Sequence, residues 1–250
     1  MDRARLFLES MYVPEAGFLR AAVTAVPDSK RIYIASDNLL AAEALSIVGS
    51  GLGNKLKQKL SAEFAGGFNQ RHEVLLGYDI PDKFYVHADE KVGEIHSTAY
   101  NLTFEILYEK PDYSRVFEDW PEYADLLAYR CLDLLLAGEN SKARELFSVL
   151  LQMWDGYGFN DKPHRTDPNS RYETYKTALA LIVCKKIEKN TGSCPANTQT
   201  INKWIALLAS LQRDDGGVVT HYIVREGVVT PFGDANTETT SITLLALMKN

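Results

Sequence analysis

Three carboxylates stand where the sequence predicts that helices begin. Asp37 precedes "NLLAAEAL", Glu173 precedes "TYKTALALIV" and Glu238 precedes "TTSITLLALM". Two carboxyl groups that face each other across a cavity can divide acid and base roles, as the hydrolysis of a glycosidic bond requires. We therefore expect Glu238, together with Asp37 or Glu173, to act as the acid and the base.

Each of these carboxylates also has a structural interpretation. Glu173 stands at the acidic position of an S-x-x-E capping box, and Asp37 fits an N-cap. Glu238 is an acid in a first helical turn, where the helix dipole favours negative charge. The polar neighbours of Glu238, among them Asp234 and Asn236, exceed what a helix cap needs. That excess favours a functional role for Glu238.

The remaining candidate residues lie near the same helix starts and the loops between them. We expect His221 to carry a proton, because imidazole titrates near neutral pH. Sugar rings pack their C–H faces on aromatic side chains, while amides and carboxylates take the hydroxyl groups. On these grounds, seven residues are predicted to bind the substrate: Asn38, Tyr157, Tyr172, Tyr222, Phe232, Asp234 and Asn236.

Motifs for metals and cofactors are missing from the sequence. The five histidines show no H-x-x-x-H or H-E-x-x-H spacing. No P-loop, dinucleotide-binding or G-x-S-x-G motif occurs. We therefore expect neither a metal nor a cofactor.

The elements that position these residues follow from a repeat. The pattern Q-x-x-D-G occurs at 152–156 and again at 212–216. Such a repeat indicates one helical unit used more than once, with glycine supplying the positive φ that ends a helix. Three segments carry one apolar stripe, typical of outer helices: 52–65, 141–154 and 199–212. Three others are apolar on nearly every side, typical of inner helices: 123–138, 174–184 and 239–248.

Outer helices around inner helices predict a mainly α-helical fold. We expect an α/α toroid of about four helical hairpins, forming a single domain over residues 1–250. A helix within 2–12 would close this ring against the terminal helix. Between 70 and 115, the segments "HEVLLGYDI", "KFYVHAD" and "STAYNLTFEILYE" alternate like strands, which predicts a small antiparallel β insertion at the rim.

The paired helices and Q-x-x-D-G loops resemble the α/α toroid superfamily, which includes the six-hairpin glycosidases and the terpenoid cyclase–prenyltransferase group. The chain is short for a six-hairpin ring, so the resemblance is to a partial ring. It implies a cavity lined by carboxylates and aromatic residues from the inner-helix starts. The D-x-D-D motif of cationic cyclisation and an aspartate-rich diphosphate motif are absent, which counts against a terpene synthase.

These expectations favour a carbohydrate-active enzyme, a glycoside hydrolase or lyase with a carboxylate-lined central cavity. The alternative is a non-catalytic toroid that binds a glycan or protein partner, with the carboxylates serving as helix caps. The formal charge of −6 argues against a nucleic-acid groove. The expected ligand is therefore a small molecule or oligosaccharide, and the oligomeric state stays open.

Composition and cysteines bear on the environment of the protein. With 46% hydrophobic and 24% charged residues, the chain is typical of a soluble protein, and no apolar run is long enough to span a bilayer. Its start lacks the apolar core of a signal peptide, which favours a cytoplasmic protein, although a secreted chain without its signal fits equally. Cys184 and Cys194 are spaced to join a helix end to the next loop in an oxidising compartment. Otherwise they, like Cys131, are small core residues.

Overall fold

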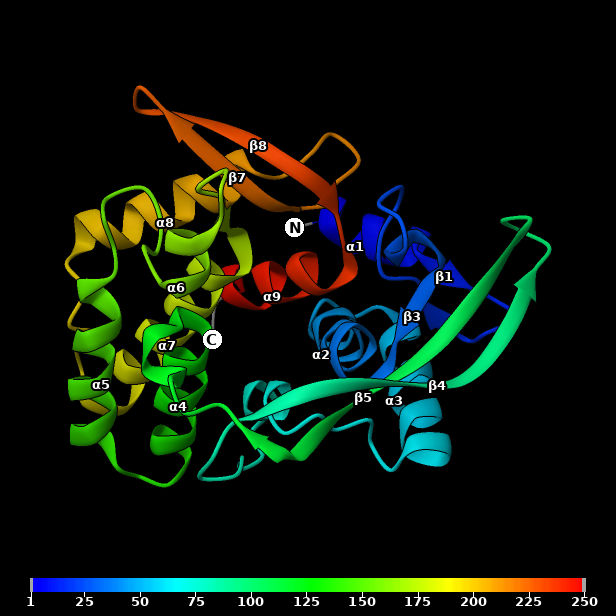
Figure 1. Ribbon diagram of the computed structural model, residues 1–250, viewed down its shortest axis with the longest axis horizontal. Coiled ribbons are helices and arrows are strands. Elements are labelled where there is room, and N and C mark those ends of the chain that lie inside the picture. Colours follow the sequence, from blue (N-terminus) through cyan, green and yellow to red (C-terminus); the bar gives the residue numbers. More distant parts are fainter. Residues whose placement is uncertain (1, 249–250) are drawn as a thin grey trace.

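The computed structural model of the protein describes residues 2–248 and combines helices with three small sheets (Figure 1). Helices account for 49% of the residues and strands for 23%. The prediction of a mainly α-helical toroid with a small antiparallel β insertion is therefore wrong. The protein has a mixed α/β fold.

The α-helices within the described residues are α1 (Asp2–Ser10), α2 (Leu39–Ile47), α3 (Gly51–Phe64), α4 (Ala124–Leu136), α5 (Asn140–Gln152), α6 (Lys162–Thr166), α7 (Thr174–Thr191), α8 (Thr198–Ser210) and α9 (Thr237–Leu247). Short helical turns are η1 (Asp28–Lys30), the π-helical η2 (Ile34–Asn38), η3 (His72–Leu76) and η4 (Trp120–Glu122). The six helices predicted from apolar periodicity are confirmed as α3, α4, α5, α7, α8 and α9.

The helices form two groups that meet at α9. In Figure 1, α4, α5, α7 and α8 gather on one side, α1, α2 and α3 lie on the other, and α9 runs between them. Helix α9 packs against α7, α2 and α1. One apolar core lies among α4, α5, α7 and α8, and a second lies around α1, α2 and α3. Leu245 of α9 packs against both cores, which explains why this helix is apolar on nearly every side.

The longest sheet is built on one extended hairpin. Strands β4 (Tyr85–Ser97) and β5 (Leu102–Val116) pair antiparallel, and β3 (Arg31–Tyr33) adds to β5 in parallel. In Figure 1 this hairpin runs below α2 and extends past α3 at the right of the view. The "HEVLL" segment, predicted as a strand, is the 3₁₀ helix η3 instead.

Two further sheets were not predicted. Strands β1 (Tyr12–Val13) and β2 (Phe18–Leu19) form a minimal antiparallel pair. Strand β6 (Tyr172–Glu173) pairs with β7 (Val219–Arg225), which pairs with β8 (Val228–Ala235). The β7–β8 hairpin connects α8 to α9 and projects along the top of Figure 1. The predicted outer-to-inner connection therefore carries a hairpin of its own.

Both Q-x-x-D-G loops form the same kind of turn. Gly156 has φ +101° and Gly216 has φ +93°, so the predicted left-handed conformation is confirmed. In each loop the aspartate accepts from a backbone N–H two residues later: Asp155 Oδ1 from Tyr157 at 2.9 Å, and Asp215 Oδ1 from Gly217 at 3.0 Å. The repeat therefore has a structural role, closing α5 and α8.

The two glycines differ in what surrounds them, which gives a matched pair of substitutions. A Cβ on Gly216 would lie 2.0 Å from the Arg3 carbonyl oxygen of α1, whereas a Cβ on Gly156 would meet nothing within 4 Å. We expect Gly156→Ala to cost about 1–2 kcal/mol from backbone strain alone. Gly216→Ala should lower the melting temperature further, because α1 must also move. Equal melting temperatures for the two variants would contradict this packing of α1.

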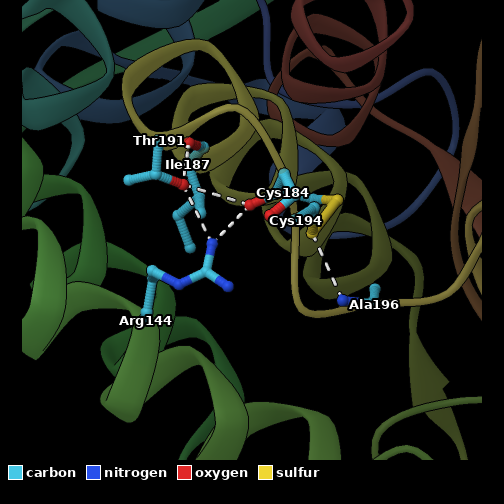
Figure 2. Close-up of a disulfide and its surroundings, with 7 residues drawn as sticks. Arg144, Cys184, Ile187, Thr191, Cys194 and Ala196 are labelled. Carbon is cyan, nitrogen blue, oxygen red and sulfur yellow. Dashed lines mark hydrogen bonds between the residues drawn. A yellow bond between two sulfur atoms is a disulfide. The ribbon is translucent and has the colours of Figure 1, made fainter.

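A disulfide closes the end of α7. Cys184 is bonded to Cys194, with their Cα atoms 5.3 Å apart (Figure 2). Beside the bond, Arg144 of α5 donates to Thr191 Oγ1 at 2.9 Å. Cys131 is buried and unbonded. The disulfide therefore holds the α7–α8 connection at the point where α5 also contacts it.

Loss of this disulfide should destabilise the protein. It closes a loop with a sequence separation of 10, for which chain entropy gives about 2–3 kcal/mol. Cys194→Ser should therefore lower the melting temperature by about 4–12 °C. A reductant should lower the melting temperature of the wild type and leave that of the variant unchanged. A wild type that melts identically with and without reductant would contradict the bond's contribution.

Candidate functional site

Several helices begin at one polar cavity of about 200 Å³ near the centre of the molecule. Asp125, Tyr175 and Glu238, the second residues of α4, α7 and α9, line it. Glu109 of β5 supplies a third lining carboxylate. We call this the central cavity. It is smaller than the roughly 300–1,000 Å³ of clefts for drug-sized ligands.

Glu238 faces a histidine whose tautomer is fixed. Its Oε1 lies 3.3 Å from Nε2 of His72. Asn69 Oδ1 accepts from the backbone N–H groups of Arg71 and His72, so the Asn69 amide nitrogen is the group 2.8 Å from His72 Nδ1. Because an amide nitrogen only donates, Nδ1 accepts, and the proton of the neutral ring sits on Nε2. The protonated Nε2 of His72 is therefore the atom that lies against Glu238.

The helix cap of α9 is made without Glu238. Asn236 is the N-cap, and its side chain accepts from Thr239 N at 2.8 Å. Among residues 2–248, Glu238 accepts no backbone hydrogen bond. Its carboxylate is therefore directed to the central cavity and His72 rather than to its own helix.

Glu109 and Asp37 are linked through Ser36. Glu109 accepts from the Ser36 hydroxyl and, at 2.9 Å, from Ala35 N. Ser36 Oγ also lies 3.3 Å from Asp37 Oδ1. Burial raises the pKa of both carboxyl groups, and the charges of Glu238 and Glu109 raise that of Asp37 further. Since one hydroxyl has one proton, a protonated Asp37 donates to Ser36, which donates to Glu109.

Asp37 does not itself line the central cavity. It is 4% exposed and lies behind Ser36, which is a lining residue. Its Oδ2 has no hydrogen-bond partner among the described residues. The sequence places Asp37 among the acids expected to face Glu238 across the cavity. In the structure the carboxylate that lines this wall of the cavity together with Glu238 is Glu109.

The opposite wall carries Asp125 and a buried ion cluster. Tyr175 Oη donates to Asp125 Oδ2 at 3.1 Å, and Lys176 Nζ lies 4.0 Å from Asp125 Oδ1. Lys176 also contacts Glu173 and, at 2.6 Å, Asp161. Burial, which lowers the pKa of Lys176, is outweighed by these carboxylates, which raise it. Lys176 is therefore a charged ammonium shared by three acids.

Arg71, His87 and Tyr129 also line the central cavity. Burial and the neighbouring Arg71 lower the pKa of His87 to about 3, so this imidazole is neutral near pH 7. Tyr129 is 1% exposed, and its ring packs edge-on against His72 with centroids 5.5 Å apart. Within residues 2–248, Tyr129 Oη and Arg71 Nε have no hydrogen-bond partner. Unpaired buried polar atoms are costly, so these two are suited to a bound polar ligand.

The other predicted catalytic residues meet at a second, open groove of about 320 Å³. Glu173 and His221 both line it and are register partners across β6 and β7. Burial lowers the pKa of His221 to about 4, and burial raises the pKa of Glu173. Glu238 lines the central cavity, so the structure separates it from Glu173 and His221.

The predicted substrate-binding residues lie elsewhere in the described part of the chain: none of the seven lines the central cavity. Asn38 is fully buried, and its side chain bonds backbone groups of Leu19 and Tyr33. Asp234 accepts from Ala25 N at 2.9 Å and from Arg213 at 3.1 Å. Asn236 is the α9 cap. These three side chains are occupied by contacts that hold the fold.

The aromatic candidates divide into buried and exposed pairs. Tyr172 and Tyr222 stack with centroids 5.2 Å apart, and their hydroxyls donate to Asp155 Oδ2 and to the Tyr157 carbonyl. Tyr157 is 44% exposed and Phe232 is 42% exposed. The guanidinium of Arg171 lies over the Phe232 ring, 5.5 Å from its centroid. Only Tyr157 and Phe232 of this set present free aromatic surface.

Sequence reasoning missed most of the cavity lining. His72 begins a segment predicted as a strand, Asn69 and Arg71 lie just before it, and Glu109 ends a predicted strand whose buried face was not assigned. Asp125 is the second residue of α4, a helix that the sequence predicted. Its position in that first turn could therefore have identified it as a candidate. The same position in α9 is what identified Glu238.

Comparisons with protein-family models, curated proteins and solved structures found no match to this chain. The resemblance to the toroid superfamily therefore stays a prediction. Within residues 2–248, no group of three or more histidine, cysteine, aspartate or glutamate side chains is arranged to hold a metal ion. No helix in that range is long and apolar enough to cross a membrane.

Proposed function

We propose that this protein hydrolyses a glycosidic bond by acid–base catalysis in the central cavity. The observation that supports this most is the pairing of Glu109 with Glu238 in one small cavity. Burial raises the pKa of Glu109, which favours its keeping a proton. Glu238 Oε1 lies 3.3 Å from the N–H of His72 Nε2, a neighbour that suits a carboxylate. One carboxyl group that holds a proton and one that does not is the pattern glycoside hydrolysis uses.

The roles follow from these surroundings. Glu109 gives its proton to the leaving oxygen, and Glu238 activates water or attacks the sugar itself. The contact from Asp37 through Ser36 gives Glu109 a path for recovering its proton. Asp37 is then a positioning residue and a proton reserve. Arg71 and Tyr129, with their unpartnered donors, orient the sugar.

Elimination by a lyase is the less favoured reaction. A lyase acts beside a uronate carboxylate, which must be neutralised by positive charge. In the central cavity that charge would have to come from Arg71, whose near neighbour Asp125 already interacts with it. The ionised Glu238 would repel the uronate from the other wall. Hydrolysis does not require an anionic substrate.

A screen of purified protein on nitrophenyl glycosides, with nitrophenol release as the readout, tests the proposal. Hydrolysis of any glycoside that is lost in a Glu109→Gln, Glu238→Gln double variant supports it. Sugar binding without turnover, measured by calorimetry on the same preparation, would identify a non-catalytic glycan-binding module. The absence of both turnover and sugar binding would contradict a carbohydrate function altogether.

A further inference from the structure

One wall of the central cavity is acidic and has no matching cation. We call Asp37, Glu109 and Glu238 the acidic wall; Glu109 and Glu238 line the cavity, and Asp37 lies behind Ser36. Among residues 2–248, no lysine or arginine forms an ion pair with any of the three. Their one ionisable partner is His72, whose Nδ1 is occupied by the Asn69 amide. Glu238, the acid of this wall that the proposed function leaves ionised, is therefore a negative charge with no lysine or arginine partner among the described residues.

The positive charge around the cavity is outnumbered by acids. Arg71 is the lining arginine; among residues 2–248 it forms no ion pair, and burial lowers its pKa while the charge of Asp125 raises it. Lys176 is shared between Asp125, Glu173 and Asp161. The acids of this cluster outnumber its cations, so it does not neutralise the acidic wall. The central cavity as a whole carries excess negative charge.

A second, independent feature points to a ligand at this place. Tyr129 Oη is buried, lines the cavity and has no hydrogen-bond partner within residues 2–248. Asp125 Oδ1 likewise accepts no hydrogen bond. A phenol oxygen and carboxylate oxygens are all acceptors, and an ammonium group offers three donors to such a set. The cavity therefore combines negative charge with free acceptors.

We propose that the sugar bound in the central cavity carries a free, protonated amino group that faces the acidic wall. This rests on the proposed function for the premise that the ligand is a sugar. An amino group next to electron-withdrawing neighbours, like the α-amino group of a peptide, titrates near about pH 8, so it is largely cationic at about pH 7. Its charge complements Glu238, and its N–H groups can donate to Tyr129 Oη, an acceptor that otherwise lacks a partner within residues 2–248. N-acetylation of the sugar removes the charge and two of the donors.

Calorimetric titration with monosaccharide probes tests this inference. The probes are glucosamine, galactosamine and mannosamine, each against its neutral parent sugar, its N-acetyl form and glucuronate. One amino sugar should bind about 10–100-fold more tightly than its parent, as hydrogen bonds between charged groups imply. Its N-acetyl form should bind no more tightly than the parent, and glucuronate should bind most weakly.

Two variants locate the preference. Glu238→Gln should reduce the preference for the amino sugar towards unity while binding of the neutral parent persists. Glu145→Gln, the same change at an exposed position of α5, should leave the preference intact. Neutral sugar or glucuronate binding as tightly as every amino sugar would overturn the inference and leave the proposed function standing. Absence of binding by every sugar would overturn both.

Discussion

Glu238→Gln should reduce turnover by about 10²–10⁴-fold, the contribution of a positioned acid or base. Glutamine preserves the shape of the side chain and its contact with His72 but cannot accept or release a proton at neutral pH. The fold should survive, because Asn236 rather than Glu238 caps α9. A charge at a helix N-terminus contributes about 0.3–1 kcal/mol. The melting temperature should therefore fall by no more than about 2–4 °C.

The matched control is Glu145→Gln, which makes the same chemical change on the exposed face of α5. It should leave both turnover and melting temperature unchanged. If turnover persists in Glu238→Gln while the melting temperature falls, Glu238 stabilises the helix terminus and is not catalytic. The assay is the rate on whichever glycoside the wild type hydrolyses, with melting followed by circular dichroism.

The two carboxylates can be told apart by the leaving group. Glu109→Gln should slow the release of a poor leaving group far more than that of an activated one, since an activated group needs little protonation. Glu238→Gln should slow both similarly. If Glu238→Gln is instead the variant that depends on the leaving group, Glu238 is the proton donor and Glu109 is the base or nucleophile. A matched loss in both variants on both substrates would mean that neither carboxyl group is the proton donor.

Periodicity was enough to locate the helices but not to assemble them. The stripes of α5 and α8 and the all-round apolar character of α7 and α9 are local properties that a sequence displays directly. That α9 would lie between two groups of helices depends on long-range packing, including its contacts with α1 and α2. The same apolar pattern fits an inner ring and a central helix equally well. The toroid was therefore a consistent extension of correct helices into a wrong fold.

The missed strands have two physical causes. The β7–β8 hairpin turns at Glu226 and Gly227, both with positive φ. Such turns favour asparagine, aspartate or glycine at the first of these positions, so glutamate there gave a weak signal. Strand β3 is only Arg31–Tyr33 and exists because it pairs in parallel with β5, far along the chain. A three-residue strand has no periodicity of its own to detect.

The candidate site was predictable at its helix starts and not beyond them. Glu238 was identified because polar residues crowd the first turn of an otherwise apolar helix. Asn69, Arg71 and His72 reach the cavity from an irregular segment before β4, where spacing along the chain says nothing about direction. Glu109 lines the cavity from β5, and its place there depends on how the β4–β5 hairpin packs in the tertiary structure.

Lys176→Met should be the most destabilising substitution that leaves side-chain volume nearly unchanged. Lys176 is 3% exposed and Asp161 is 1% exposed by side chain, with their charged atoms 2.6 Å apart. Asp161 also accepts from Ala124 N at 3.0 Å, so it joins the start of α4 to α7. Removing one partner of a buried pair costs about 3–5 kcal/mol, because the other charge stays buried and unpaired.

The pH dependence of that loss distinguishes charge from packing. Burial raises the pKa of Glu173 in this cluster and Lys176 opposes that shift, so removing Lys176 should raise the folded-state pKa of Glu173 further above its unfolded value. A group of this kind binds more protons in the folded state, so stability rises as pH falls. The free energy of unfolding of the variant should therefore partly recover as the pH falls from about 8 to about 5, measured by urea unfolding.

Lys142→Met is the control, because Lys142 and Glu139 pair at 3.2 Å with side chains 64% and 49% exposed. The Lys142→Met change should cost less than about 1 kcal/mol of folding stability. If Lys176→Met costs no more than this control does, the buried cluster contributes nothing to the stability of the fold.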